Sequence, residues 1–345
     1  MMEKFTISRD PKYYHAFPDV ALTPSGKLVC VISECVHHGD RSYTRIQLRD
    51  SSDRGRTWSE KRPLTEPAEG GPFWNCPRLS LLHDGRLVAV VDRVGTGERS
   101  SEYEKLQNYL FFSEDEGESW SEPILAPAQG VVPDRLRELD NGRWLLACHG
   151  EDPDLGNLVE RLWYSDDQGT SWEGPVIVGR QAGLNLCEVS LLQIEGPALV
   201  AFHRENSSRG WDCYKTFSTD YGETWSAPIA FPLPGCHRPV AGFLQDGRIL
   251  ITHRFMQGGK GWLGSWTQNF FAALTDRDSA LAPTREEACT RILPVDFDRS
   301  PQSDLGYSGW VQFPDGEIYV VSYIVDDWPR AQIRGYSLRA EDFLL

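Results

Sequence analysis

The sequence has no long apolar run and no excess of basic residues. None of its apolar stretches approaches the roughly 18 residues that a membrane-spanning helix needs, so we expect no membrane partner. The 345 residues include 35 Lys and Arg against 50 Asp and Glu, which gives a net charge of −15. Proteins that bind the phosphate backbone need a basic face, and this balance therefore argues against a nucleic-acid partner.

An apolar leader is also missing at the N-terminus. The first ten residues, MMEKFTISRD, are charged from the third position and contain no apolar core segment. A secretory signal is therefore not expected in them. We predict a cytoplasmic protein, and a secreted one only if a signal has been removed.

The cysteines and histidines lack the spacing of a metal site. The eight cysteines form no CxxC pair, and most lie in apolar runs such as LVCVIS and LLACHG. They are predicted to be buried free thiols in a reducing compartment. The closest two histidines, His37 and His38, are adjacent, and adjacent residues seldom ligate one ion. We therefore expect no metal and no cofactor.

The sequence does contain repeats. A tight turn followed by an apolar run recurs six times, 51 to 69 residues apart, with turn glycines at Gly26, Gly85, Gly142, Gly196, Gly247 and Gly316. Asp-Gly and Asn-Gly turns between apolar runs are strong β-hairpin signals. A second motif alternates with the first as SSDRGRTW, SEDEGESW, SDDQGTSW and STDYGETW, with aspartates at Asp53, Asp115, Asp167 and Asp220.

These repeats predict an all-β fold. Self-similarity at this period with strands alone is typical of a β-propeller, here with six four-stranded antiparallel blades in one domain over residues 1–345. A β-sandwich is the alternative, but it does not explain a fixed period. The fifth unit has only a degenerate second turn, LTDRDSA, near residue 275. The sixth unit lacks an outer strand, and we predict that residues 4–8 supply it and close the ring.

The S-x-D-x-G-x-S/T-W motif is the Asp box, and through it the chain resembles the sialidase (neuraminidase) superfamily of six-bladed propellers with Asp-box, or BNR, repeats. The boxes are expected to be structural. Their Asp and Ser or Thr side chains bond the backbone of their own turn, the Gly takes a positive φ, and the Trp packs between neighbouring sheets. We therefore assign no catalytic role to the four box aspartates.

Polar residues gather at the positions where a propeller places its site, at the start of each blade's first strand and the end of its second. Seven of the eight histidines, all but His83, lie there. About half of these groups are expected to serve inter-blade hydrogen bonds, since buried polar groups must be paired. The predicted substrate-binding residues are Arg78, Arg135, Arg204, Arg238, Arg254, His37, His149, His203 and His237. Aromatic side chains suited to sugar stacking are Trp74 and also Phe73, Trp211, Trp262, Trp266, Trp310 and Trp328.

The resemblance implies catalytic roles for three residues and a binding role for a fourth. Tyr307, ahead of the last Asp-Gly turn, matches the nucleophile, and Glu188 in NLCEVSLL matches its partner. Arg204 in AFHRE matches a carboxylate-binding arginine, and Asp40 in CVHHGDRS matches the acid/base. Glu188 would take the proton of Tyr307, and Asp40 would protonate the leaving oxygen and then activate water, with retention of configuration.

Two of the three arginines that the resemblance implies for the sugar carboxylate are absent. Ala16 stands in HAFP where an arginine is expected, and the stretch GSWTQNFFAALT offers none for the third. Such a clamp holds a carboxylate bidentately. We therefore predict an exo-acting, retaining glycoside hydrolase for a non-standard or acidic sugar, with Arg238, Arg78 or Arg254 as replacements.

Two other classes remain open. One is a polysaccharide lyase, or a propeller enzyme directed to uronates or rhamnose, in which His and Tyr move protons and Arg neutralises the uronate. The number of histidines near the expected site favours this class. The other is a non-catalytic Asp-box propeller that binds glycans or proteins. The sequence predicts no particular oligomeric state.

Overall fold

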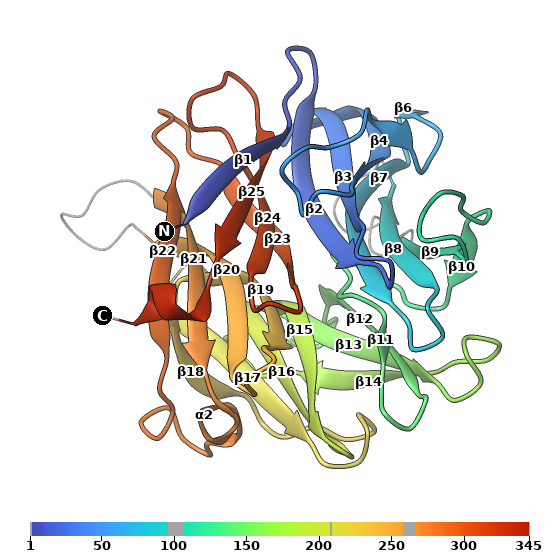
Figure 1. Ribbon diagram of the computed structural model, residues 1–345. Coiled ribbons are helices and arrows are strands. Elements are labelled where there is room, and N and C mark those ends of the chain that lie inside the picture. The colour runs from blue at the N-terminus through green and yellow to red at the C-terminus, as the bar shows by residue number, and fades with distance from the viewer. Residues whose placement is uncertain (1, 96–105, 208, 258–266, 345) are drawn as a thin grey trace. The chain divides into compact units, whose positions relative to one another are not determined.

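The computed structural model describes residues 2–95, 106–207, 209–257 and 267–344 (Figure 1). The chain forms two compact units: unit 1 is Met1–Leu136 with Arg299–Leu345, and unit 2 is Arg137–Asp298. Each unit holds three antiparallel sheets and its own clusters of buried apolar side chains. One domain over residues 1–345 stays a prediction. Trp262 and Trp266, expected above to stack on sugar, lie outside the described residues.

Unit 1 contains the first, second and last sheets in chain order. The first pairs β2 (Tyr14–Leu22), β3 (Leu28–His37), β4 (Asp40–Ser51) and β5 (Arg62–Pro63), with β6 (Ala68–Glu69) also on β4. The second pairs β7 (Phe73–Leu81), β8 (Leu87–Val94), β9 (Gln107–Ser113) and β10 (Ile124–Ala126). The last pairs β23 (Leu305–Gln312), β24 (Ile318–Ile324), β25 (Gln332–Leu338) and β1 (Glu3–Ser8). A short 3₁₀ helix, Ala340–Phe343, follows β25.

Unit 2 contains the three sheets between them. They consist of β11 (Arg137–Glu138), β12 (Trp144–Glu151), β13 (Leu158–Ser165) and β14 (Glu173–Gly179); β15 (Leu186–Glu195), β16 (Ala198–Glu205), β17 (Asp212–Ser218) and β18 (Ile229–Pro234); and β19 (Cys236–Phe243), β20 (Ile249–Gln257), β21 (Thr267–Thr275) and β22 (Arg291–Phe297). The predicted all-β fold, a propeller of six four-stranded antiparallel blades, is confirmed, and in the first blade the short β6 is an additional strand on β4.

The N-terminal strand completes the last blade, as predicted. β1 pairs antiparallel with β25, with Glu3 opposite Ser337 and Thr6 opposite Arg334. In Figure 1 the blue β1 lies along the red β25, so the two ends of the chain share one sheet. The outer strand of this blade therefore comes from the opposite end of the sequence.

The Asp boxes are structural turns. In the first box Asp53 accepts hydrogen bonds from the backbone N–H groups of Arg56 and Thr57 and from the hydroxyls of Ser51 and Thr57. Gly55 has a φ of 81°, and a Cβ on it would overlap the ring of Tyr319 on β24. The same hydrogen bonds from box Ser and Ser or Thr to Asp115, Asp167 and Asp220 repeat in the other three boxes.

The degenerate fifth turn forms a short helix instead of an Asp box. Asp276 caps α2 (Arg277–Leu281) by accepting from the backbone N–H of Ser279 at 2.7 Å. Lys215 on β17 is fully buried, and its ammonium donates to the carbonyls of Ser279 and Ala280. The helix thus has a cation at its carbonyl end, where the helix dipole favours one.

Seven cysteines are buried and Cys289 is exposed, and all eight are free thiols, so the prediction of buried thiols holds for all but one. No helix among the described residues is long and apolar enough to span a membrane.

Candidate functional site

Four first strands of the blades share a strained position. The pairing of β2, β7, β15, β19 and β23 with the second strand of each blade shifts register near the start of the strand. In four of these strands a non-glycine residue with positive φ lies at the shift: Phe17, Glu188, Arg238 and Tyr307. Val132, which precedes β11, also has a positive φ. Such backbone costs energy and persists only where the surroundings hold it, commonly at functional sites. Two predicted catalytic residues, Glu188 and Tyr307, therefore have strained backbone at the register shift of their strands. Arg238 has the same backbone conformation at the same place in its strand.

The sequence carries a local signal for this position. Proline follows the position in four strands or their approach segments, in the dipeptides Phe17-Pro18, Cys76-Pro77, Val132-Pro133 and Arg238-Pro239. The repeated X-Pro aligns four of the six repeats. In the other two, Glu188 and Tyr307 lie at the corresponding register shift.

In unit 2, Glu188 forms a buried ion pair with Arg204. Nη1 of Arg204 donates to Oε1 of Glu188 at 2.7 Å, and its Nη2 donates to Oδ1 of Asn206 at 2.6 Å. The backbone N–H of Glu188 donates to Nδ1 of His149 at 3.4 Å. Burial raises the pKa of Glu188, but the charge of Arg204 and its hydrogen bond outweigh burial and lower the pKa to about 2. Glu188 is therefore a carboxylate at neutral pH.

Further basic side chains surround this pair. Arg238 and His149 both act electrostatically on Glu188, and Arg254 donates to Nδ1 of His237 at 3.3 Å. Burial, together with Arg204 and Arg254, holds the pKa of His237 well below its usual value. Burial lowers the pKa of His149 to about 4. Unit 2 thus groups three cations with Glu188 beside two neutral imidazoles.

His203 has different surroundings. Its Nε2 lies 3.0 Å from the hydroxyl of Thr216, and its ring packs against Gly179. The side chain is fully buried, and burial lowers its pKa to about 3. These are the contacts of a neutral core side chain.

In unit 1, Tyr307 lies in an aromatic cluster. Its ring centroid is 5.0 Å from that of Phe17 and 6.5 Å from that of Tyr323. Cys76 and Val132 belong to the same apolar cluster, and Tyr307 is 8% exposed. Ala16, at the position expected for a clamp arginine, is fully buried in this cluster as well.

Arg78 and Arg135 share a carboxylate that the sequence analysis overlooked. Asp19 is fully buried, accepts from Nε of Arg135 at 2.9 Å, and lies 3.5 Å from Nε of Arg78. Burial raises the pKa of Asp19, and the charges of Arg135 and Arg78 lower it further than burial raises it. Arg78 also donates to the carbonyl of Ser308 at 3.1 Å. These two arginines therefore neutralise a buried acid. Asp19 directly follows the X-Pro pair of its strand, which could have marked it.

The β3–β4 turn carries Asp40 and the adjacent histidines. Asp40 is exposed, and hydrogen bonds from Ser42 lower its pKa. The ring of His37 meets that of Tyr14 edge-on at 5.0 Å. Nδ1 of His38 lies 2.6 Å from Oδ2 of Asp304, just before β23. Asp304 also accepts from the hydroxyls of Tyr14 and Tyr323. Asp304 and Tyr14 are not among the site residues predicted from the sequence.

Trp74 lies in a hollow between β4–β5 and the second Asp box. It is 7% exposed, and its ring meets Tyr109 and Phe111 at 5.5 and 6.0 Å. The guanidinium of Arg93 lies 4.8 Å over the Trp74 ring. The hollow, of about 520 Å³, is also lined by Trp120 and Thr65.

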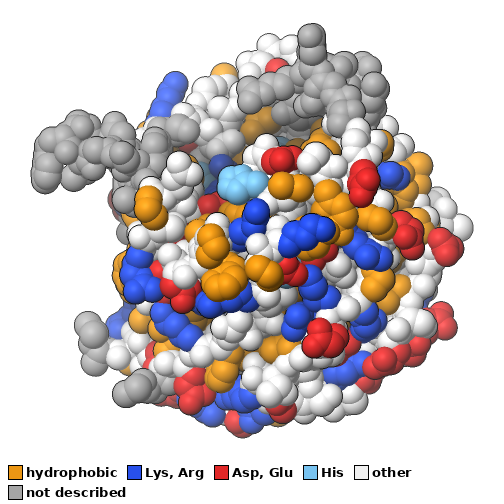
Figure 2. Space-filling view, turned by 90° about the horizontal axis from the view of Figure 1, so that it is seen from above, with side chains coloured by type: hydrophobic (Ala, Val, Ile, Leu, Met, Phe, Trp, Pro, Cys, Tyr) orange, Lys and Arg blue, Asp and Glu red, His pale blue; other side chains and the backbone are white. Residues whose placement is uncertain are grey.

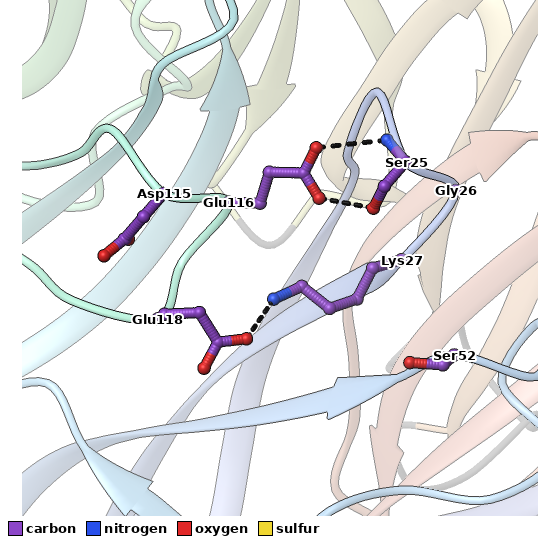
Figure 3. A pocket seen from close by; sticks show the side chains of 7 residues that line it. All are labelled: Ser25, Gly26, Lys27, Ser52, Asp115, Glu116 and Glu118. Carbon is purple, nitrogen blue, oxygen red and sulfur yellow. Dashed lines mark hydrogen bonds and ion pairs between the residues drawn. The ribbon is translucent and has the colours of Figure 1, made fainter.

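A second hollow of unit 1, of about 480 Å³, is a contact between two turns (Figure 3). Figure 3 shows the carboxylate of Glu116 bonded to the backbone and hydroxyl of Ser25, and Lys27 paired with Glu118 at 2.6 Å. These hydrogen bonds and the ion pair connect the first Gly turn to the second Asp box across the hollow. The polar groups that line it are therefore partners of one another.

Asp10, His15 and Glu34 place their ligand atoms close enough for a metal ion. The ammonium of Lys61 already lies among them, at 2.8 Å from Asp10, 2.6 Å from Glu34 and 3.4 Å from Nε2 of His15. A cation of the protein itself therefore takes the place that a metal would need. This cluster does not favour a metal site.

The surface charge is mixed on the face that Figure 2 shows. Basic side chains lie there among acidic and hydrophobic ones, and a histidine side chain reaches the surface.

Comparisons with known proteins show one family for the chain and related solved structures with the same fold. The BNR repeat-like domain family matches residues 73–320. Sialidase-4 of Homo sapiens is 30% identical over 149 residues, which cover 38% of this chain and 29% of the human protein. A protein of unknown function from Dyadobacter fermentans has a TM-score of 0.80 at 21% identity, with 98% of each chain covered.

Two enzymes share the fold at lower identity. The intramolecular trans-sialidase of Ruminococcus gnavus has a TM-score of 0.69 at 14% identity, with 97% of this chain and 96% of that chain covered. The α-L-arabinofuranosidase of Fusarium graminearum has a TM-score of 0.66 at 12% identity, with 99% of each chain covered.

Proposed function

Because the chain belongs to the BNR repeat-like domain family, we propose that it is an exo-acting, retaining glycoside hydrolase. The observation that carries the proposal is the buried ion pair of Glu188 and Arg204, with Glu188 at a strained position of β15. The relatives named sialidase, trans-sialidase and arabinofuranosidase support the same class of chemistry. The partner is then a carbohydrate.

In the proposed reaction Tyr307 attacks the anomeric carbon. A phenol, with an ordinary pKa near 10, must lose its proton to do so. The sequence resemblance assigns Glu188 as the base for this proton, and with a pKa of about 2 the Glu188 side chain is ionised at neutral pH. The sequence pattern points to Asp40 for the acid/base step.

The substrate is proposed to be an acidic sugar other than ordinary sialic acid. A buried methyl group, Ala16, stands where the resemblance expects an arginine. Arg204, Arg238 and Arg254 of unit 2 offer guanidinium groups that match a carboxylate. The anionic group of the sugar would be held by this set.

The test is hydrolysis of a panel of aryl glycosides, with 4-methylumbelliferyl sialoside and 4-nitrophenyl α-L-arabinofuranoside among the probes. Tyr307→Phe removes one oxygen and keeps the ring, so we expect folding to persist and the rate to fall at least about 100-fold. Tyr319→Phe is the matched control, since Tyr319 bonds the carbonyl of Gly55 in an Asp box. Near-full activity of Tyr307→Phe would overturn the nucleophile assignment. Product anomers followed by NMR would test retention.

One observation favours a second candidate, a lyase. His149 has a pKa of about 4, and that of His237 is held well below normal, so both are neutral bases at pH 7 near arginines. A neutral base beside a cation suits proton abstraction next to a uronate carboxylate. Ultraviolet absorbance of an unsaturated uronate, formed from polyuronates by wild-type protein, would favour this class over hydrolysis.

A further inference from the structure

We propose that His38, held by Asp304, is the acid/base of the reaction in place of Asp40. This inference rests on the proposed glycosidase function. All the residues that carry it belong to unit 1, as does Tyr307.

Three donors from separate parts of the chain converge on Asp304. Oδ2 lies 2.6 Å from Nδ1 of His38 and accepts from the hydroxyl of Tyr14, while Oδ1 accepts from the hydroxyl of Tyr323 at 2.8 Å. Because an ionised carboxylate only accepts, the imidazole donates through Nδ1. A carboxylate on one ring nitrogen fixes the tautomer, orients the ring and stabilises its protonated form.

The tyrosines that bond the Asp304 carboxylate are buried, whereas the His38 imidazole is exposed to solvent. Tyr14 and Tyr323 are 1% and 0% exposed, and the side chain of Asp304 is 16% exposed. The side chain of His38 is 44% exposed. Among the described residues, Nε2 of His38 makes no hydrogen bond. The imidazole is thus anchored on one nitrogen and presents the other to an incoming molecule.

The imidazole lies close to Tyr307 through a shared neighbour. The ring of Phe17 is 5.0 Å from that of Tyr307, 5.3 Å from that of His38 and 5.3 Å from that of Tyr323. Asp304 itself precedes Tyr307 by three residues on the way into β23. His38 and Tyr307 therefore contact the same strained residue, and a sugar bound at Tyr307 would place its leaving group in this neighbourhood.

Asp40 has the wrong environment for this role. It is exposed, and the hydrogen bonds from Ser42 favour its charged form and lower its pKa. A general acid must hold its proton near the working pH. An imidazole gives and takes a proton in that range.

The proposed steps conserve protons and electrons. In the first, the Tyr307 oxygen bonds the anomeric carbon as the bond to the leaving oxygen breaks. The phenol proton passes to the general base of the proposed function, and Nε2–H of His38 protonates the leaving oxygen, which departs as an alcohol. In the second, neutral Nε2 takes a proton from water while the water oxygen attacks the anomeric carbon. The bond to Tyr307 breaks, and the general base returns its proton to the phenol.

The first experiment measures kcat/KM of His38→Gln on aryl glycosides whose leaving groups differ in acidity. Loss of a general acid matters most for poor leaving groups. We expect at least about 100-fold loss on 4-methylphenyl glycosides and much less on 2,4-dinitrophenyl glycosides. Added azide should restore turnover of the activated glycosides, since it attacks without a general base. His83→Gln is the control, because His83 lies in the β7–β8 turn and is assigned no role in the site.

The second experiment tests Asp304 as a positioning residue by measuring kcat and KM separately. Asp304→Asn removes the carboxylate that orients the His38 ring, so kcat should fall while KM changes little. Asp304→Glu should restore kcat in part. An unchanged kcat in Asp304→Asn would overturn this positioning role.

The outcomes separate the two proposals. If the wild type cleaves a probe and Tyr307→Phe does not, but His38→Gln keeps the wild-type rate on poor leaving groups, the role of His38 is overturned alone. If the wild type cleaves no glycoside of the panel, the proposed function and the role of His38 both fall. A loss in His38→Gln that azide does not rescue and that is equal for all leaving groups would also overturn the acid/base role.

Discussion

At the scale of single residues, the charge state of Glu188 depends on one neighbour. The carboxylate is buried, and burial by itself disfavours the charge. Arg204, at 2.7 Å, provides the main compensation, with smaller help from His149 and Arg238. The pair is therefore a place where removing one partner leaves a charge without its counter-charge.

Arg204→Gln should destabilise the fold at neutral pH by about 3–5 kcal/mol, the usual cost of breaking a buried pair. In the wild type the lowered pKa of Glu188 adds stability that is complete above its unfolded value, near 4.3, and is lost as pH falls toward about 2. In Arg204→Gln the pKa of Glu188 rises, so protonation relieves the defect. Urea unfolding at pH 7 and pH 4 measures this.

The deficit of Arg204→Gln should accordingly be smaller at pH 4 than at pH 7. The double variant Glu188→Gln with Arg204→Gln is the control, because it removes both charges. It should be more stable at pH 7 than Arg204→Gln alone. Equal unfolding midpoints for the wild type and Arg204→Gln at pH 7 would contradict the prediction.

At the scale of elements, two kinds of structure hold a blade together. The Asp box closes its outer hairpin with hydrogen bonds between residues at most four apart, as from Ser51 and Thr57 to Asp53. β1, in contrast, completes a sheet by pairing residues more than three hundred positions away, such as Glu3 with Ser337. Both can be tested without touching the candidate site.

Deleting residues 1–9 should lower the melting temperature sharply. The deletion removes β1 and leaves β25 as an unpaired sheet edge. Deleting residues 1–2 alone, which precede β1, is the control and should leave melting nearly unchanged. If both deletions melt like the full chain, the strand contributes nothing to closure.

Asp53→Ala should lower the free energy of unfolding by about 1–3 kcal/mol, since several turn hydrogen bonds are lost at about 0.5–1.5 kcal/mol each. Activity should stay within about twofold of the wild type, because the box is assigned no catalytic role. Asp53→Asn keeps one oxygen acceptor, so its free energy of unfolding should lie between those of the wild type and Asp53→Ala. Chemical denaturation measures the stability, and a glycoside assay on the same samples measures the activity. A large loss of activity with intact stability would argue against a purely structural role of the Asp box.

At the scale of the whole molecule, family membership and substrate are separate questions. The chain shares its fold with a trans-sialidase and an arabinofuranosidase, which act on different sugars. A shared fold therefore does not identify the substrate, which depends on the side chains of a site. In unit 1 the expected clamp position is occupied by Ala16, which packs in the apolar cluster around Tyr307 and offers no group that binds a carboxylate.

We expect turnover of 4-methylumbelliferyl sialoside to be weak or absent compared with an established sialidase assayed beside it. The physical reason is the loss of bidentate contacts at Ala16, where a buried methyl group cannot hold a carboxylate. The comparison is made on kcat/KM at matched enzyme concentration. Efficient cleavage of the sialoside would show that other arginines supply the clamp.

Much of the fold was predictable because its signals are local. The Gly turns and Asp boxes depend on residues two to four positions apart, whose spacing alone makes the hydrogen bonds. The outer strand β1 followed from counting strands in the last repeat. The fifth turn was recognised as degenerate, but its helix α2 depends on the capping contact of Asp276 and on Lys215.

The candidate site was predictable only in part. The strand ends that carry Glu188, Arg204 and Tyr307 can be recognised from the repeats, since each blade brings the same register positions to the same end. The sequence could not say that Arg135 would bond Asp19, 116 residues away, or that Tyr14 would bond Asp304, 290 residues away. Which polar groups neutralise each other inside the fold depends on distances between strands that no spacing along the chain encodes. Repeat, fold class and blade count were thus determined by the sequence alone, whereas the partners of the buried charges were decided by tertiary packing.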